Sequence, residues 1–212
     1  MYISVNNYKE KYLVGKSAAA ISDEIVKLRR EILKVKNKLE SPAGAYDFRS
    51  YSNESTAIDI YKEYLFAAVY HLASLTGESP AFTEEEKSSF VFDSVVDDVS
   101  CLTLTVGRYL EKKYELDLSG SEASVREMRL ESDAVQKSVD IAYAREVIRG
   151  LHLGEWKESY TPEQYGCTLN EPVRWQLRLD YANGSAPRFF DGVGVFPYNF
   201  SVLCRLLGAD II

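Results

Sequence analysis

The spacing of apolar residues changes along the chain, and this change constrains the fold more than any other feature of the sequence. In the first 80 residues they recur every three or four positions, which is the period of an amphipathic helix. From about Phe90 they begin to alternate with polar residues, which is typical of strands with one buried face. We therefore expect an α+β protein in which N-terminal helices pack with an antiparallel β-sheet, and a C-terminal β-hairpin precedes a short helix. A helical region over 1–80 and an α+β region over 81–212 would make one connected body.

The clearest helical stripe lies between Ser17 and Glu40. Its apolar residues are Ile21, Ile25, Leu28, Ile32, Val35 and Leu39. Their alternating spacing of four and three places them at the a and d positions of a heptad. Glu24 and Glu31 then occupy g positions and Arg29 and Lys36 occupy e positions, so two parallel copies would pair opposite charges in a homodimer. The alternative is that the stripe packs on the protein's own core, because fewer than three heptads are present.

The same helix carries a local excess of positive charge. The whole chain has a formal net charge of -7, yet the six Lys and Arg residues between positions 27 and 38 are accompanied by one acidic residue, Glu31. Candidate members of a basic face are Lys27, Arg30, Lys34 and Lys38. This face could bind phosphates or an acidic partner, or it could be the solvated side of the helix. Because the chain is acidic overall and no aromatic residues lie among these cations, we do not expect nucleic-acid binding.

Further elements follow from local patterns. A second helix is expected after a connecting loop at 41–53, and it ends at Gly77. Alternation over 101–106, and more weakly over 114–118 and 126–130, predicts an antiparallel meander, and a helix is expected over 138–151. The clearest strand, 174–181, is followed by an Asn183-Gly184 turn. We expect a loop with one extra residue, which places Phe189 opposite Leu179 on the apolar face. A last helix runs from Pro197 to Gly208.

The last third of the chain is rich in aromatic residues. Ten of the 45 residues from Trp156 to Phe200 are Trp, Tyr or Phe, whereas reactive groups are sparse. Trp and Tyr combine a large contact area with a polar group, so part of this segment could form a recognition surface. The candidate binding residues are Glu155, Trp156, Tyr160, Tyr198 and Asn199. The alternative is that the aromatic side chains close a small core between sheet and helix.

Three segments of this region resemble a known family. They read Leu151-His-Leu-Gly-Glu-Trp156, Trp175-x-Leu177-x-Leu179-x-Tyr181 and Phe196-Pro-Tyr-Asn-Phe200. This pattern resembles the C-terminal part of a family of uncharacterised bacterial proteins. The chain departs from the family at 170–173 and at 191–195. The resemblance implies a bacterial protein with this C-terminal architecture, and it implies no particular reaction.

Conventional catalytic motifs are not found in the sequence. There is no Cys-x-x-Cys, His-Glu-x-x-His or Gly-x-Ser-x-Gly, and the cluster Asp93, Asp97 and Asp98 does not have the spacing of a calcium loop. We therefore expect neither a metal nor a cofactor, and a noncatalytic protein-binding or self-assembling module is the favoured interpretation. The alternative is a small-molecule-binding enzyme whose site is assembled from Glu155, His152, Cys167 and Asp191.

The cysteines and the hydropathy indicate a compartment. Three cysteines are widely spaced, and the N-terminal residues do not form a signal peptide, so we expect reduced thiols and a cytoplasmic protein. No apolar run approaches the roughly 20 residues that a membrane-spanning helix needs. We expect no role in the membrane.

Overall fold

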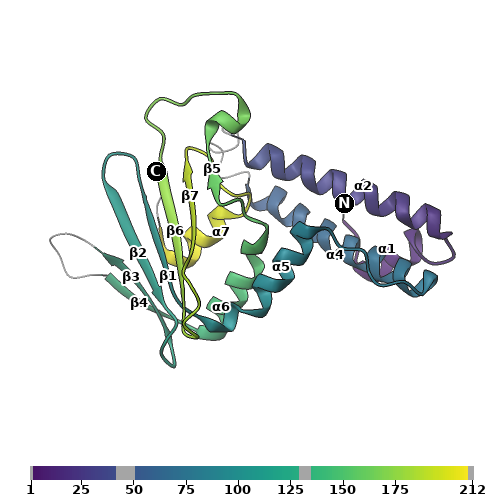
Figure 1. Ribbon diagram of the computed structural model, residues 1–212, viewed down its shortest axis with the longest axis horizontal. Helices are drawn as coiled ribbons and strands as arrows, with labels where there is room; N and C mark the ends of the chain where they lie inside the picture. The colour runs from purple at the N-terminus through teal and green to yellow at the C-terminus, as the bar shows by residue number, and fades with distance from the viewer. Residues whose placement is uncertain (1, 42–50, 129–134, 210–212) are drawn as a thin grey trace. The chain divides into compact units, whose positions relative to one another are not determined.

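The fold is α+β, as the sequence predicts. The computed structural model describes residues 2–41, 51–128 and 135–209, with positions 51–54 and 135 described by their backbone alone. The chain divides into two compact units, Met1–Glu84 and Glu85–Ile212. The first unit is helical, and the second contains a seven-stranded sheet with its own helices (Figure 1).

The helical unit contains α1 (Val5–Tyr12), α2 (Ala18–Leu39) and α4 (Tyr51–Thr76). The hydroxyl of Ser17 accepts a hydrogen bond from the amide of Ala20 and so caps α2, which is a favourable role for Ser before a helix. The stripe of α2 is buried within the chain's own helical unit at Ile21, Ile25, Leu28, Ile32 and Leu39, while Val35 is half-buried. The side chains of α4 that are buried include Ile58, Leu65, Ala68 and Val69. The heptad residues therefore form the core of this unit.

The first helix, α1, was not expected from the sequence. The hydroxyl of Ser4 accepts a hydrogen bond from the amide of Asn7 and caps the helix. Its one buried residue is Tyr8, whose ring stacks on Tyr64 with centroids 4.2 Å apart and whose hydroxyl donates to Glu24 at 3.1 Å. Burial, together with the nearby Glu24 carboxylate, raises the pKa of Tyr8. Because one tyrosine anchors α1, the helix has no apolar period for sequence analysis to detect.

The second unit is built on a single sheet. Its strands are β1 (Val99–Gly107), β2 (Glu111–Asp117), β3 (Ala123–Met128), β4 (Val135–Val139), β5 (Ser159–Tyr160), β6 (Arg174–Tyr181) and β7 (Arg188–Val193). Their order is β4-β3-β2-β1-β6-β7-β5, and every neighbouring pair is antiparallel except β5 and β7, which are parallel. The expected antiparallel meander is confirmed over β1 and β2, and its third strand, β3, begins at Ala123 rather than at position 126. Positions 129–130 of the expected third strand lie outside the described residues, and β4 extends the meander.

Helices and short 3-10 turns complete the second unit. They are α5 (Glu84–Ser94), α6 (Ile141–Gly150) and α7 (Phe200–Leu207), with η1 (Val96–Asp98), η2 (Leu153–Glu155) and η3 (Pro162–Tyr165). The helix α7 ends at Gly208, which has the left-handed backbone conformation with φ of 62°. The aromatic ring of Phe200 on α7 lies 4.7 Å from the ring of Trp175 on β6, centroid to centroid. This packing joins α7 to the inner face of the sheet (Figure 1).

Several expected boundaries are wrong, and the last helix, α7, begins at Phe200 rather than at Pro197. The helix α5 covers the stretch in which the strand period was expected to begin, and its Phe92 packs in the core. The strand β4 includes Ser138 and Val139, so the helix expected over 138–151 starts only at Ile141, after Asp140 caps it by accepting from the amide of Tyr143. Pairing of β4 with β3 overrides the local helical pattern. The helix α4 already begins at Tyr51, and positions 42–50 of the expected loop lie outside the described residues.

The register of the β6–β7 hairpin also differs from the prediction. Arg188, and not Phe189, lies opposite Leu179, and Phe190 lies opposite Leu177. Phe190 is buried, while Phe189 is 48% exposed. The guanidinium carbon of Arg188 lies 4.9 Å from the ring centroid of Phe190 and 5.6 Å from that of Phe92. Arginine can thus occupy the inner face because its charged group packs on aromatic rings.

Candidate binding groove of the helical unit

The helical unit has an apolar groove between α2 and α4, with a cavity volume of about 200 Å³. The residues that line it are Ser22, Ile25, Val26, Arg29, Val69, Leu72, Ala73, Thr76, Glu78, Ser79 and Ala81. Its apolar side chains come from both helices, and its polar lining residues include Arg29, Thr76 and Glu78. The guanidinium of Arg29 donates a hydrogen bond to the carbonyl of Ala81 at 2.9 Å. The segment that follows α4 is therefore tied back to α2 along one side of the groove.

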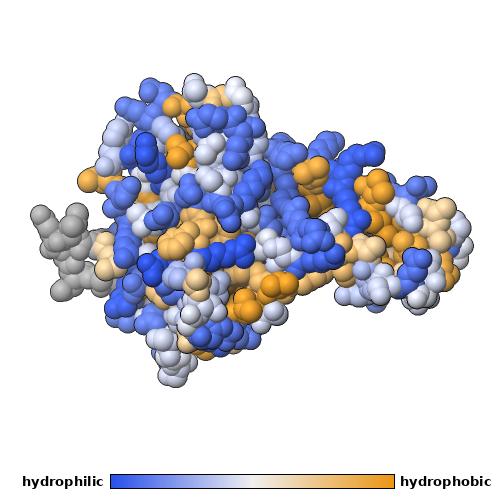
Figure 2. All heavy atoms as spheres, in the orientation of Figure 1, coloured by the Kyte–Doolittle hydropathy of each residue, from blue (hydrophilic) through white to orange (hydrophobic). Residues whose placement is uncertain are grey.

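Exposed apolar residues extend this groove along α2. Val26 is 54% exposed and Leu33 is 56% exposed. They are seven positions apart, which is about two helical turns, so they share one face of α2. Tyr70 of α4 is also exposed, and its ring packs edge-on against Phe82 with centroids 5.6 Å apart. Hydrophobic residues are visible at the surface of the helical unit among hydrophilic ones (Figure 2).

The candidate basic face is on the exposed side of α2. Lys27, Arg30, Lys34 and Lys38 are all exposed, and Asp23 is the exposed acidic residue of that helix. Lys27 is paired with Glu24, with Nζ and Oε2 3.0 Å apart, and lies over the ring of Tyr12. Helical periodicity places Arg30 and Lys34 next to the row of Val26 and Leu33. The groove, the exposed apolar row and the cations thus occur in succession around α2.

The aromatic candidates lie in the interior of the second unit. Trp156, Tyr160, Tyr198 and Asn199 are at most 4% exposed. The indole nitrogen of Trp156 donates to the side-chain oxygen of Asn199 at 3.0 Å and to the carbonyl of Leu151 at 3.1 Å. Asn199 in turn donates to the same carbonyl at 2.7 Å. This arrangement corresponds to the alternative in which the aromatic side chains close a core, and it leaves only half-buried Glu155 of this set at the surface.

His152 is joined to α5 and adopts an unusual backbone conformation. Its φ of 47° lies in the left-handed region, which costs free energy for residues other than glycine. The nitrogen Nδ1 lies 3.2 Å from the Ser89 hydroxyl and 3.5 Å from Oδ2 of Asp93. Because both partners contact the same ring nitrogen, this cluster is not the relay of a catalytic triad, in which the two nitrogens have different partners.

The other residues of the alternative enzyme site have separate partners. The thiol of Cys167 donates to the carbonyl of Pro162 at 3.4 Å, and Asp191 accepts a hydrogen bond from the hydroxyl of Ser159 at 3.0 Å. Glu155 belongs to η2. No contact joins His152, Cys167 and Asp191 among the interactions of the described residues, so the structure does not pair the Cys167 thiol with His152 as a base.

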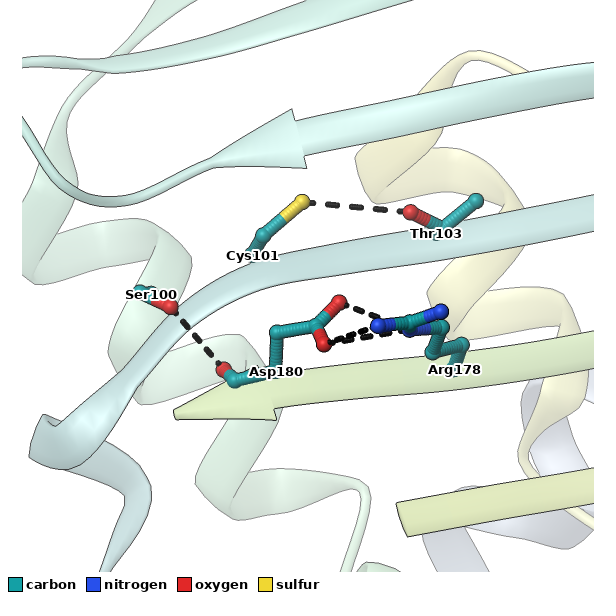
Figure 3. A network of polar contacts seen from close by, with 5 residues as sticks. All are labelled: Ser100, Cys101, Thr103, Arg178 and Asp180. Atoms are coloured by element: carbon teal, nitrogen blue, oxygen red, sulfur yellow. Dashed lines mark hydrogen bonds and ion pairs between the residues drawn. The ribbon is translucent and has the colours of Figure 1, made fainter. Parts of the chain in front are cut away.

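The outer face of the sheet is polar. Arg178 pairs with Asp180 at 2.6 Å on β6, and Ser100 donates to the backbone carbonyl of Asp180 at 3.2 Å (Figure 3). On the neighbouring strand β1, the Cys101 sulfur lies 3.8 Å from the Thr103 hydroxyl. Burial raises the pKa of the Cys101 thiol, and the nearby carboxylates, Glu115 first, act in the same direction. A thiol with a raised pKa is a poor nucleophile at neutral pH.

The described part of the chain was compared with the requirements of a metal site and of a membrane-spanning helix. Within residues 2–41, 51–128 and 135–209, no three His, Cys, Asp or Glu side chains are grouped so that they could hold a metal ion. The acidic residues expected as a cluster have other partners: Asp93 contacts His152, Asp97 pairs with Arg149 at 2.6 Å, and Asp98 accepts from Asn183 at 3.0 Å. None of the helices described is both long and apolar enough to span a bilayer.

Comparison of the chain with protein-family models, with curated proteins and with solved structures found no match. The resemblance of the C-terminal region to a bacterial family accordingly stays a prediction.

The groove was missed by sequence analysis, although one signal for it was present. Val26 and Leu33 are apolar residues outside the heptad stripe, and apolar residues on the solvent side of a helix indicate a second contact surface. The walls contributed by Val69, Ala73 and Ala81 could not be predicted, because they depend on how α4 and the segment after it pack on α2.

Proposed function

We propose that the protein is a noncatalytic protein-binding module whose α2–α4 groove receives apolar side chains of a partner. The observation that carries this proposal is the groove itself, which is lined by apolar side chains and continues into exposed Val26 and Leu33. A cavity of roughly 150 Å³ can hold a benzene-sized group, so a volume of about 200 Å³ is sufficient for one large apolar side chain. Burial of one such side chain contributes about 1.5–3 kcal/mol. The exposed apolar row would add further contact area.

Self-assembly is the second form of the proposal, and the position of the stripe limits it. A homodimer through Ile21, Ile25, Leu28, Ile32, Val35 and Leu39 would require α2 to separate from α4, because most of these residues are buried within one chain. Pairing of two copies through the exposed face of α2 would bring two sets of cations together and would be disfavoured. We therefore propose a different protein as the partner.

We further propose that the module acts in the bacterial cytoplasm. The unpaired state of Cys101, Cys167 and Cys204 is compatible with a reducing compartment. The bacterial assignment depends on the resemblance of the C-terminal segments.

The proposal can be tested by selecting ligands from a library of displayed helical peptides. Wild-type protein is used for selection, and Ala73→Phe, which fills the groove, is used for counter-selection. The matched control is Ser74→Phe. Ser74 is exposed on α4, so this substitution adds the same ring outside the groove. We expect enriched peptides to bind wild type and Ser74→Phe alike and to lose at least tenfold in affinity for Ala73→Phe. The proposal would be overturned if the enriched peptides bound all three proteins equally, or if the selection enriched no peptide at all.

A further inference from the structure

We propose that the partner segment is an acidic amphipathic helix that lies along α2, an inference that rests on the proposed function of the groove. The surface of α2 has two rows that run side by side. The apolar row contains Val26 and Leu33, and the basic row contains Arg30 and Lys34. A partner that matches both rows needs an apolar stripe flanked by carboxylates.

The charge of the basic row defines the chemistry of the partner. Its members are four positions apart, so their attachment points are separated by about 6 Å along the helix. Half-buried Glu31, between Arg30 and Lys34, offsets one of the positive charges, and exposed Asp23 lies almost two turns before Arg30. The six Lys and Arg residues between positions 27 and 38 therefore leave this stretch with a net positive charge. Because the whole chain has a net charge of -7, this row is a local exception to an acidic protein. Carboxylates spaced four residues apart on a partner helix would have the same separation.

The geometry of the groove favours a helix over an extended segment. The groove is bounded by α2 and α4, whose backbone groups are already hydrogen-bonded within each helix. An extended peptide would bury its own amide and carbonyl groups against apolar side chains without partners, which costs free energy. A helix satisfies these groups internally and presents apolar residues at intervals of three and four.

The experiment compares three fluorescent peptides of about 18 residues, a length that allows appreciable helix formation. All have the same leucine stripe, and the flanking positions carry Glu, Gln or Lys. Binding is measured by fluorescence anisotropy at about 50 mM salt, where screening is weak. We expect the Glu peptide to bind about five- to tenfold more tightly than the Gln peptide, since two surface ion pairs are worth about this factor, and the Lys peptide to bind most weakly.

Matched variants separate the contribution of charge from that of the groove. Arg30→Glu/Lys34→Glu should reverse the order of the peptides, and Arg30→Gln/Lys34→Gln should remove the preference. Lys112→Glu/Lys113→Glu, which makes the same change on exposed β2 residues, should leave the order unchanged. Equal binding of all three peptides to wild type, lost in Ala73→Phe, would overturn the acidic partner and leave the proposed function intact. Failure of all three peptides to bind the wild-type protein would overturn both.

Discussion

Trp175 and Gly192 lie opposite each other on β6 and β7, and the indole of Trp175 occupies the space that a side chain at position 192 would need. A Cβ atom built at Gly192 would lie 2.3 Å from the indole nitrogen. That nitrogen donates to the carbonyl of Val195 at 2.8 Å, and the ring contacts Phe200. The absence of a side chain at position 192 therefore allows a tryptophan to pack between the sheet and α7.

The first prediction concerns this contact. Gly192→Ala should lower the free energy of unfolding by about 1–3 kcal/mol, because the indole cannot move without losing its hydrogen bond. Gly150→Ala is the control: no atom lies within 4 Å of a Cβ there, and the residue is helical, so we expect stability to be unchanged or raised by up to about 1 kcal/mol. Urea unfolding measures both. Equal stability of Gly192→Ala and wild type would contradict the packing described.

The second prediction concerns the buried amide of Asn199. Asn199→Ala should cost about 1–3 kcal/mol, because it removes one acceptor from the indole nitrogen of Trp156 and one donor from the carbonyl of Leu151. Asn199→Asp should cost more at neutral pH, because its carboxylate would be buried beside that carbonyl.

The effect of Asn199→Asp should also depend on pH. Burial would raise the pKa of the introduced carboxyl above its unfolded value, so the folded variant retains a proton that the unfolded chain loses. Relative to wild type, the variant should therefore be most stable at about pH 4 and lose stability as the pH rises through the raised pKa. Chemical denaturation at several pH values between about 4 and 8 checks this. A pH-independent difference would show that the carboxylate is not buried.

The third prediction concerns Arg188 on the inner face of the hairpin. Arg188→Ala should destabilise the protein by about 1 kcal/mol, since the guanidinium covers the rings of Phe92 and Phe190. Arg178→Ala is the comparison on the outer face, where the residue pairs with Asp180, and exposed pairs contribute little. We expect the outer substitution to change unfolding in urea by less than about 0.5 kcal/mol. If Arg178→Ala lowered the free energy of unfolding more than Arg188→Ala, the register that places Arg188 on the inner face would be contradicted.

The fourth prediction concerns stability in alkaline solution. Burial raises the pKa of the Cys204 thiol, so above about pH 8.5 the unfolded chain loses this proton while the folded chain keeps it. The contribution of this thiol to the free energy of unfolding should therefore be fully present below that pH. Above it, the contribution should decrease by at most about 1.4 kcal/mol per pH unit. Cys204→Ala should show a shallower decrease than wild type between about pH 8.5 and 10. Parallel curves for the two proteins would contradict this contribution.

Thiol labelling provides an independent check on Cys204. In native protein, Cys101 and Cys167 are half-buried and should react with iodoacetamide before Cys204, which should react only after denaturation. Mass spectrometry of peptides identifies the labelled positions.

Local sequence patterns were sufficient to predict the helix α2 and the strand β6. Ile21, Leu28 and Leu39 repeat with the helical period, and Trp175, Leu177 and Leu179 alternate, so each segment has one apolar face to bury. This local information predicted both elements, their inner faces and the α+β class. The sequence could not determine whether the α2 stripe packs within one chain or between two, because the same pattern satisfies both arrangements.

Tertiary packing decided the features that depend on distant residues. Arg188 takes the inner position of the hairpin because Phe92, almost 100 residues earlier, supplies a ring for its guanidinium. The strand β4 forms where β3 offers a pairing edge, and α1 is held by the stacking of Tyr8 on Tyr64. The groove exists because Ile25 and Val69 lie on facing helices. Contacts between residues far apart in the chain determine these features. The local period of apolar residues shows which face of an element is buried, but it does not specify which distant residues that face contacts.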